Sequence, residues 1–99
     1  MLNKYGIPDR TMKEVAKFAK KNSVTKVILF GSRAKGTNGE RSDIDIAVIG
    51  GDFENFYCDI KEKVNSLLSF DIVKLDKTIS GELEKEIEKD GIVIYEENG

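Results

Sequence analysis

Two aspartates separated by a single residue are the first feature of this sequence that could carry out chemistry. Asp43 and Asp45 belong to the segment DIDIAVI, whose alternation is typical of a half-buried β-strand. On a strand the two carboxylates lie on the same face, about 6.6 Å apart along the backbone. Two anions this close repel, and each raises the pKa of the other unless a cation lies between them. The pair is therefore a candidate site for a divalent metal ion.

A glycine-serine pair and several basic residues precede the aspartates. The apolar segment TKVILF leads directly into Gly31 and Ser32, where a turn leaves backbone N–H groups free to bind phosphate oxygens. Gly31 permits close approach of the backbone, and Ser32 adds a hydroxyl donor. Positive charge in the same loop comes from Arg33, Lys35 and Arg41. A phosphate-binding turn followed by a metal-binding pair is the combination that Mg²⁺-nucleotide chemistry needs.

Less specific explanations fit parts of this pattern. A D-x-D pair taken alone is more often a solvent-facing pair on an exposed or edge strand, because short motifs have high false-positive rates. Only the neighbouring turn and basic residues favour the metal site. The segment from Gly31 to Thr37 lacks the lysine of a P-loop, and no long helix follows it. The run from Asp43 is no EF-hand, which requires glycine where Val48 stands.

Missing residue types exclude several classes of site. The sequence contains no histidine and a single cysteine, Cys58. A Ser-His-Asp triad, a histidine-assisted cysteine nucleophile, a histidine-ligated zinc and an internal disulfide are therefore excluded. A metal ion here must be held mostly by oxygen, which favours Mg²⁺, Mn²⁺ or Ca²⁺.

Length and charge set further bounds. The 99 residues predict one domain, 1–99, with one core. No apolar run approaches the roughly 18 residues of a membrane span, and the N-terminus has no signal peptide, so we expect a cytoplasmic protein without membrane contact.

Residues 1–42 carry ten Lys/Arg against three Asp/Glu, and residues 43–99 carry six against fifteen. This asymmetry indicates a basic face for a phosphate-bearing partner or, as we favour for the first helix, solvated lysines. A weakly acidic chain is not expected to bind nucleic acid unaided.

Hydrophobic periodicity predicts an α/β domain. The predicted helices are 9–22, 53–69 and 80–90, and the predicted strands are 25–30, 43–49, 70–75 and 92–95. Residues 31–41 are a predicted loop with at most one helical turn. Strand 25–30 is apolar on both faces, which is typical of a central strand. In the last two helices we expect the following side chains to face the core: Phe53, Phe56, Tyr57, Ile60, Val64, Leu67, Leu68, Leu83 and Ile87, with Gly91 ending the last helix.

These motifs together resemble the DNA polymerase β-like nucleotidyltransferase superfamily. Gly31-Ser32, ten intervening residues and then Asp43-Ile44-Asp45 match its motif. The chain is most similar to the smallest branch, the minimal nucleotidyltransferases. GIPDRTMKEV resembles the first helix of that branch, KVILFGSRAKG and SDIDIAV its core, and FDIVKLD and LEKEIEKDGIVIYE its ending. The resemblance implies a single-domain α/β (α+β) fold, a mixed β-sheet with helices packed against it.

The resemblance also implies a reaction, the transfer of a nucleoside monophosphate, expected to be AMP from ATP, to an acceptor hydroxyl. Two Mg²⁺ ions, or Mn²⁺, would be held by Asp43, Asp45 and a third aspartate from a neighbouring strand, here Asp71. Asp71 would also help to activate the acceptor and take its proton. The alternative interpretation of Asp71 is a surface carboxylate at the start of a strand. Gly31 and Ser32 would bind the β- and γ-phosphates, with Arg33 beside them.

A partner protein is implied in the same way. Minimal members pair with a small helical protein of the HEPN or substrate-binding type from a neighbouring gene. In some pairs that protein is a toxin, and the minimal nucleotidyltransferase is the antitoxin that adenylylates a tyrosine on it. We therefore expect a hetero-oligomer, and an exposed apolar patch where the partner docks. Two alternatives stay open: a binding module that neutralises the partner by contact alone, and an enzyme that modifies a small molecule.

Overall fold

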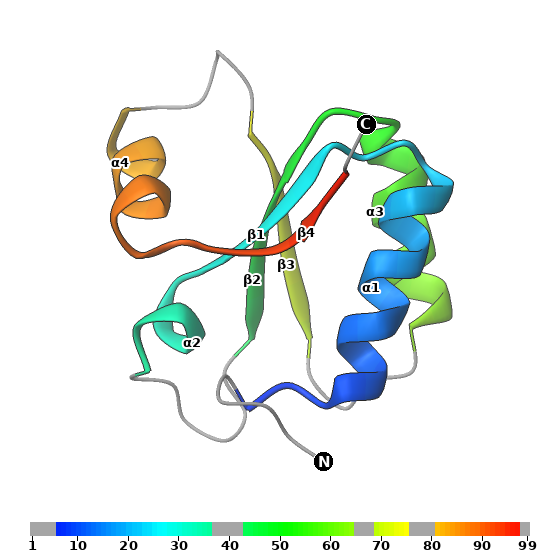
Figure 1. Cartoon of the computed structure of the whole chain (residues 1–99), viewed down its shortest axis with the longest axis horizontal. Helices are drawn as coiled ribbons and strands as arrows, with labels where there is room; N and C mark the ends of the chain where they lie inside the picture. Colours follow the sequence, from blue (N-terminus) through cyan, green and yellow to red (C-terminus); the bar gives the residue numbers. More distant parts are fainter. Residues whose placement is uncertain (1–5, 37–42, 65–68, 76–80, 98–99) are drawn as a thin grey trace.

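The helices and strands expected from the sequence are present in the computed structural model, which describes residues 6–36, 43–64, 69–75 and 81–97 (Figure 1). The elements are α1 (Asp9–Lys21), β1 (Lys26–Phe30), α2 (Ser32–Lys35), β2 (Ile44–Ile49), α3 (Phe53–Lys63), β3 (Phe70–Lys74), α4 (Gly81–Asp90) and β4 (Ile92–Glu96). The single helical turn expected after Gly31 is α2. The predicted mixed fold of helices and strands is confirmed.

The four strands form one mixed sheet in the order β3-β2-β1-β4. β1 pairs antiparallel with both β2 and β4, whereas β2 and β3 run parallel. β1 is therefore the interior strand that its two apolar faces predicted. β2 is interior as well, with partners on both sides, so the D-x-D pair does not lie on an edge strand.

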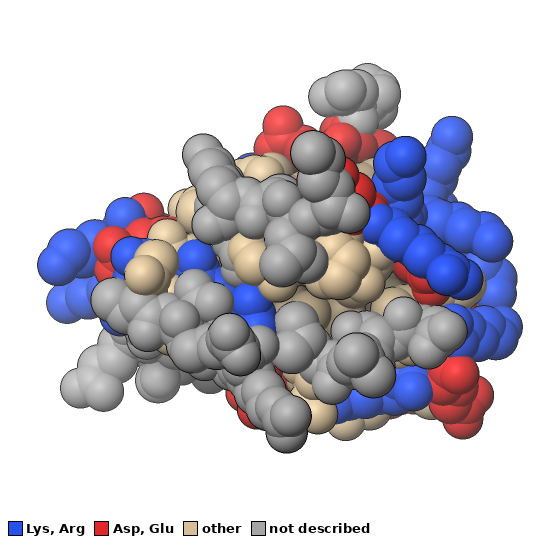
Figure 2. Space-filling view, turned by 90° about the horizontal axis from the view of Figure 1, so that it is seen from below, with Lys and Arg blue, Asp and Glu red and all other residues tan. Residues whose placement is uncertain are grey.

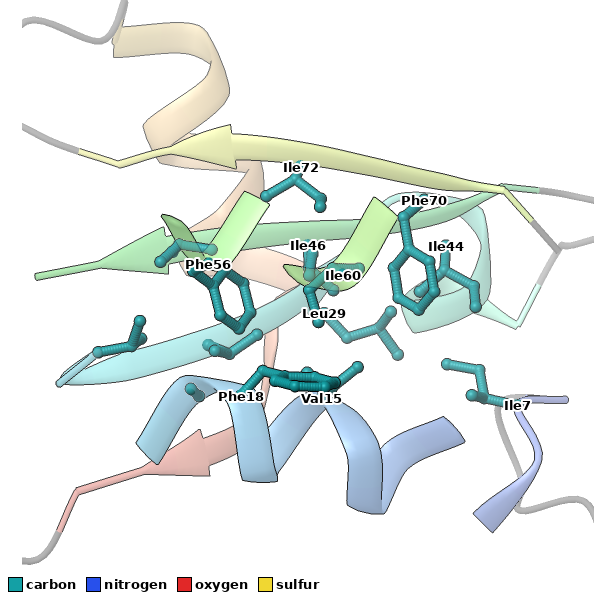
Figure 3. Packing of buried hydrophobic residues seen from close by; sticks show 14 residues of the cluster. Ile7, Val15, Phe18, Leu29, Ile44, Ile46, Phe56, Ile60, Phe70 and Ile72 are labelled. Atoms are coloured by element: carbon teal, nitrogen blue, oxygen red, sulfur yellow. The ribbon is translucent and has the colours of Figure 1, made fainter. Parts of the chain in front are cut away.

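One face of the sheet carries the main core, beneath α1 and α3 (Figures 1 and 3). Val15 and Phe18 of α1 and Phe56 and Ile60 of α3 point toward the sheet, where Leu29, Ile44, Ile46, Phe70 and Ile72 meet them. All of these side chains are buried. The alternation along β2 sends Ile44 and Ile46 into this core and Asp45 to the opposite face.

The opposite face is covered over part of its area by α4. Phe30, Ala47 and Ile87 form a second buried cluster there. Ala47, which alternation along β2 places on the same face as Asp43 and Asp45, is fully buried. α4 packs against β1 and covers the sheet around Ala47. The buried cluster under α4 does not include Asp43 or Asp45. The predicted helix end is confirmed: Gly91 follows α4, and its N–H donates to Ile87 O at 2.8 Å.

α3 differs from the prediction in length and in one facing residue. The helix ends at Lys63, since Val64 is extended, with φ −78° and ψ 118°. Leu67 and Leu68 lie outside the described residues, as does the side chain of Leu83. Tyr57, expected in the core, is 39% exposed. The apolar arc of α3 is wider than the surface it covers, so only Phe56 and Ile60 at its centre are fully buried.

A buried carboxylate joins α3 to the end of α1, and the sequence analysis did not find it. Asp59 accepts hydrogen bonds from Asn22 Nδ2 at 3.0 Å and Lys21 Nζ at 3.4 Å, and it pairs with Lys63 Nζ at 3.1 Å. Asn55 Nδ2 donates to Asn22 Oδ1 in the same network. These donors, the Asn22 amide first, hold the pKa of Asp59 below its ordinary value of 3.8. The network fixes α3 against α1 on the side away from the aspartate pair's face.

Lysine and arginine gather most densely on the side of α1 and α3 (Figure 2). The exposed lysines of these helices are Lys13, Lys17, Lys20, Lys21, Lys61 and Lys63. The exposure of the α1 lysines agrees with the interpretation of a solvated helix face. Lys61 instead reaches Phe70 O on β3, and Lys21 and Lys63 pair with Asp59. None of the described helices combines the length and the apolar composition that crossing a bilayer requires.

Candidate functional site

The three predicted carboxylates lie on two adjacent strands. Asp43 directly precedes β2, Asp45 belongs to it, and Asp45 is the register partner of Asp71 on β3. Paired residues of neighbouring strands point to the same face, about 4.8 Å apart. Ile44 and Ile72 point into the core, so these aspartates occupy the other face. Asp43 and Asp71 are exposed and Asp45 is half-buried. The parallel pairing thus places the third aspartate beside the D-x-D pair.

The glycine-serine turn lies directly against Asp45. Phe30, the last residue of β1, is the register partner of Asp45, so Gly31 leaves the sheet beside that carboxylate. Gly31 has φ 76° and ψ −155°, a conformation open almost only to glycine. A methyl group on its Cα would overlap Asp45 Oδ2 and lie 3.2 Å from Asp45 Cγ. Glycine is needed here because the carboxylate occupies the space of a side chain.

Ser32 begins α2 immediately after this turn and is half-buried. Lys35 N donates to Gly31 O at 3.2 Å, which closes the single turn of helix. The N–H groups at the start of a helical turn make no hydrogen bond within that turn, and groups of this kind commonly bind anions. The turn therefore presents its first N–H groups and the Ser32 hydroxyl at the end of β1, next to the aspartates.

Arg33, the residue expected beside Gly31 and Ser32 at the phosphates, has a buried side chain. Its side chain is only 2% exposed, and the guanidinium donates to Gly6 O at 3.1 Å. The side chain therefore ties the segment that enters α1 to α2. This role could not be found by spacing, because the acceptor is a backbone carbonyl 27 residues away.

The donor set of the site fits a hard divalent cation that also binds a nucleotide. Asp43, Asp45 and Asp71 offer carboxylate oxygens only, which suits Mg²⁺ or Mn²⁺. Within the described ranges, no three acidic or cysteine side chains are grouped closely enough to hold an ion by themselves. Mg²⁺ sites commonly use one or two carboxylates and complete their coordination with water and substrate phosphates. The glycine-serine turn beside Asp45, which the sequence predicts to bind phosphate, fits that division.

The sheet places a glycine-serine turn against aspartates on two adjacent strands. This arrangement is the one expected of a nucleotidyltransferase domain. Residues 13–99 match the family model described as polymerase beta, nucleotidyltransferase. The chain belongs to this nucleotidyltransferase family. No curated protein matches the sequence.

Solved structures with the same fold include toxin-antitoxin complexes. A chain in a crystal structure of a toxin-antitoxin with AMP-PNP is 26% identical, with a TM-score of 0.68 over 88% of this chain and 74% of that one. The MNT antitoxin complex with a tri-AMPylated HEPN toxin from Shewanella oneidensis gives a match of 22% identity, a TM-score of 0.62, and coverage of 90% and 72%. The second match supports the fold alone.

Proposed function

We propose that this protein is a metal-dependent nucleotidyltransferase that moves AMP from ATP to a hydroxyl group of a partner protein. The observation that carries the proposal is the joint placement of Gly31 against Asp45 and of Asp45 beside Asp71. A phosphate-binding turn and a carboxylate set are thereby brought together from three strands. Family membership over residues 13–99 supports the same activity.

The residues divide the work between the nucleotide and the acceptor. The N–H groups of the Gly31-Ser32 turn and the Ser32 hydroxyl bind the triphosphate and orient it. Asp43, Asp45 and Asp71 would hold two Mg²⁺ or Mn²⁺ ions, which, when bound, offset the negative charge of the phosphates and favour ionisation of the acceptor hydroxyl.

Asp71, the outermost of the three, faces the acceptor and takes the proton from its hydroxyl. The acceptor oxygen forms a bond to the α-phosphorus as the bond from that phosphorus to the bridging oxygen breaks. Pyrophosphate is the leaving group.

A helical protein of the HEPN type is the partner we propose, with a tyrosine as the acceptor and an antitoxin role in the cytoplasm. The support is the likeness to a toxin-antitoxin chain crystallised with AMP-PNP, at 26% identity. The resulting assembly is a hetero-oligomer.

One surface feature favours a second candidate, a module that neutralises its partner by contact alone. Phe53, Tyr57 and Cys58, with Glu54, line a mainly apolar pocket on the outer side of α3. Tyr57 is among the exposed large hydrophobic side chains. Exposed apolar surface of this kind favours protein binding whether or not transfer takes place.

The test compares the wild type with Asp71→Asn and with Glu62→Gln, an exposed carboxylate of α3. Each protein is incubated with the helical partner, ATP and Mg²⁺, and the partner is weighed by mass spectrometry. The wild type and Glu62→Gln should add AMP to the partner. Asp71→Asn should lose about 10²-fold or more in rate and little stability, because its side chain is exposed. If none adds nucleotide, yet all bind and silence the partner equally, the contact-only module replaces the enzyme.

A further inference from the structure

The carboxylate set of the site ends at a free strand edge. Among the strands that the structure describes, β3 is the outermost on its side of the sheet, and β2 is its one partner (Figure 3). Along the row that runs from Phe30 through Asp45 to Asp71, Asp71 is the last residue. Whatever lies beside β3 is therefore adjacent to the carboxylate that we place next to the acceptor.

The hydrogen bonds at the two ends of β3 show which backbone groups face outward. Ile44 N donates to Ser69 O at 2.8 Å, and Leu75 N donates to Val48 O at 2.9 Å. In a parallel ladder, alternate residues of a strand direct both backbone groups to the same neighbour. Odd-numbered residues of β3, Asp71 included, thus bond to β2, and Phe70, Ile72 and Lys74 direct their backbone groups away from the sheet.

Little else occupies this outward edge. The ammonium of Lys61 donates to Phe70 O, which agrees with the outward direction of that carbonyl. Among the described residues, no other side chain or strand bonds to this edge. The backbone groups of Ile72 and Lys74 remain available to a further strand. Such a strand would lie about 4.8 Å from β3.

We propose that the acceptor enters the site as an extended peptide segment that pairs with the free edge of β3, with its hydroxyl residue opposite Asp71. This inference rests on the proposed function and names the form of its substrate. Side chains of paired residues lie on one face with Cβ atoms about 4.5–5.5 Å apart. The acceptor side chain thereby becomes the next member of the row after Asp45 and Asp71. Its hydroxyl proton passes to Asp71 as its oxygen bonds to the α-phosphorus and pyrophosphate leaves.

Backbone chemistry favours a peptide over other acceptors at this edge. Alternating N–H and C=O groups complement another extended polypeptide, and main-chain bonds of this kind commonly capture peptides. Lys61 and Lys74 oppose the pairing of two copies of β3, because pairing would bring like charges together. An edge that discourages self-association and adjoins the reactive carboxylate suits a transient substrate strand.

The first experiment uses a synthetic seven-residue peptide with a central tyrosine between alternating threonine and valine residues. Two further peptides carry N-methyl groups, one on its odd-numbered residues and the other on its even-numbered residues, so that the methyl groups face β3 in only one of them. With ATP and Mg²⁺, we expect methylation in one peptide to raise the KM by at least about tenfold and methylation in the other to leave the KM unchanged. Equal effects in the two methylated peptides, or no effect in either, would contradict strand addition.

The second experiment changes the edge itself. Lys74→Pro removes an outward N–H, and proline is tolerated where the N–H of an edge strand points outward. Lys74→Ala is the matched control, because it removes the same side chain and keeps the N–H. We expect the proline variant to raise the KM for the peptide at least about tenfold, the alanine variant to leave it unchanged, and both to bind ATP-Mg²⁺ as the wild type does.

Hydrogen exchange supplies a readout that needs no turnover. The Ile72 amide should exchange readily in the free protein and become protected when the peptide is added with a non-hydrolysable ATP analogue. Transfer that is insensitive to both Lys74 variants, with no protection of Ile72, would overturn strand addition and leave the transferase intact. Absence of both ATP-Mg²⁺ binding and transfer in the wild type would refute the proposed function and this inference with it.

Discussion

Replacing Gly31 by alanine tests the contact on which the site is built. The glycine has φ 76° and ψ −155°, and the added methyl group would overlap Asp45 Oδ2. Two responses are open to the variant. The turn can move out of its glycine-only conformation, or the Asp45 carboxylate can rotate away from the turn. Either response separates the N–H groups that we propose bind phosphate from the carboxylate set.

The magnitude follows from the backbone conformation. A non-glycine residue in this region of φ and ψ costs about 1–3 kcal/mol. For a domain of this size, each kcal/mol lowers Tm by about 4–8 °C. A cost of about 2 kcal/mol therefore predicts a fall in Tm of about 8–16 °C. The protein should still fold, since the overlapping atom belongs to the end of a side chain that can rotate.

Gly36→Ala is the matched control. Gly36 also has a positive φ, 78°, but it adopts the ordinary left-handed conformation, and an added Cβ would meet nothing within 4 Å. We expect this variant to lose only about 1 kcal/mol and to bind ATP-Mg²⁺ as the wild type does. Gly31→Ala should bind ATP-Mg²⁺ at least about tenfold more weakly in calorimetric titration, since binding loses preorganised donors.

One outcome of comparing Gly31→Ala with Gly36→Ala would contradict this reasoning. If Gly31→Ala and Gly36→Ala melt at the same temperature and bind ATP-Mg²⁺ equally well, the approach of Gly31 to Asp45 is not needed for the site. The assignment of the glycine-serine turn to the triphosphate would then be wrong.

Three further changes probe other parts of the molecule. Asp43→Asn should keep the fold and abolish the tightening of ATP binding by Mg²⁺ or Mn²⁺; metal-independent ATP affinity in the wild type would contradict the metal site. Phe56→Ala should lower the free energy of unfolding by about 3–5 kcal/mol in urea denaturation, because the ring is fully buried; a loss below about 1 kcal/mol would show that the core under α3 is misplaced. Asp59→Asn should lower Tm near neutral pH, because hydrogen bonds from Asn22, Lys63 and Lys21 hold the pKa of Asp59 below 3.8 in the folded state. The ionised carboxylate thus stabilises the fold above that pH. The difference in Tm between the variant and the wild type should shrink as the pH falls through the folded-state pKa of Asp59. A difference in Tm that stays constant from about pH 7 to about pH 2 would contradict this account.

Local patterns in the sequence were enough to predict the elements and to suggest which residues form the candidate site. Alternation in DIDIAVI predicted a half-buried strand, and the structure confirms it as β2, with Ile44 and Ile46 in the core. The motif from Gly31 to Asp45 predicted a turn beside a carboxylate pair, and the two are in contact through the antiparallel pairing of β1 and β2. Hydrophobic periodicity and turn-forming residues involve positions close together in the chain, so they can be recognised from the sequence alone.

Other features depended on which surfaces meet across the fold. The pairing of Asp45 with Asp71 requires the parallel register of β2 and β3, which packing of both strands against α3 and the core decides. Arg33 is buried because the carbonyl of Gly6 lies within its reach. Tyr57 is exposed although its spacing matched a core position. A periodic pattern reports how apolar a face is, whereas burial and register depend on the long-range contacts that only the tertiary structure supplies.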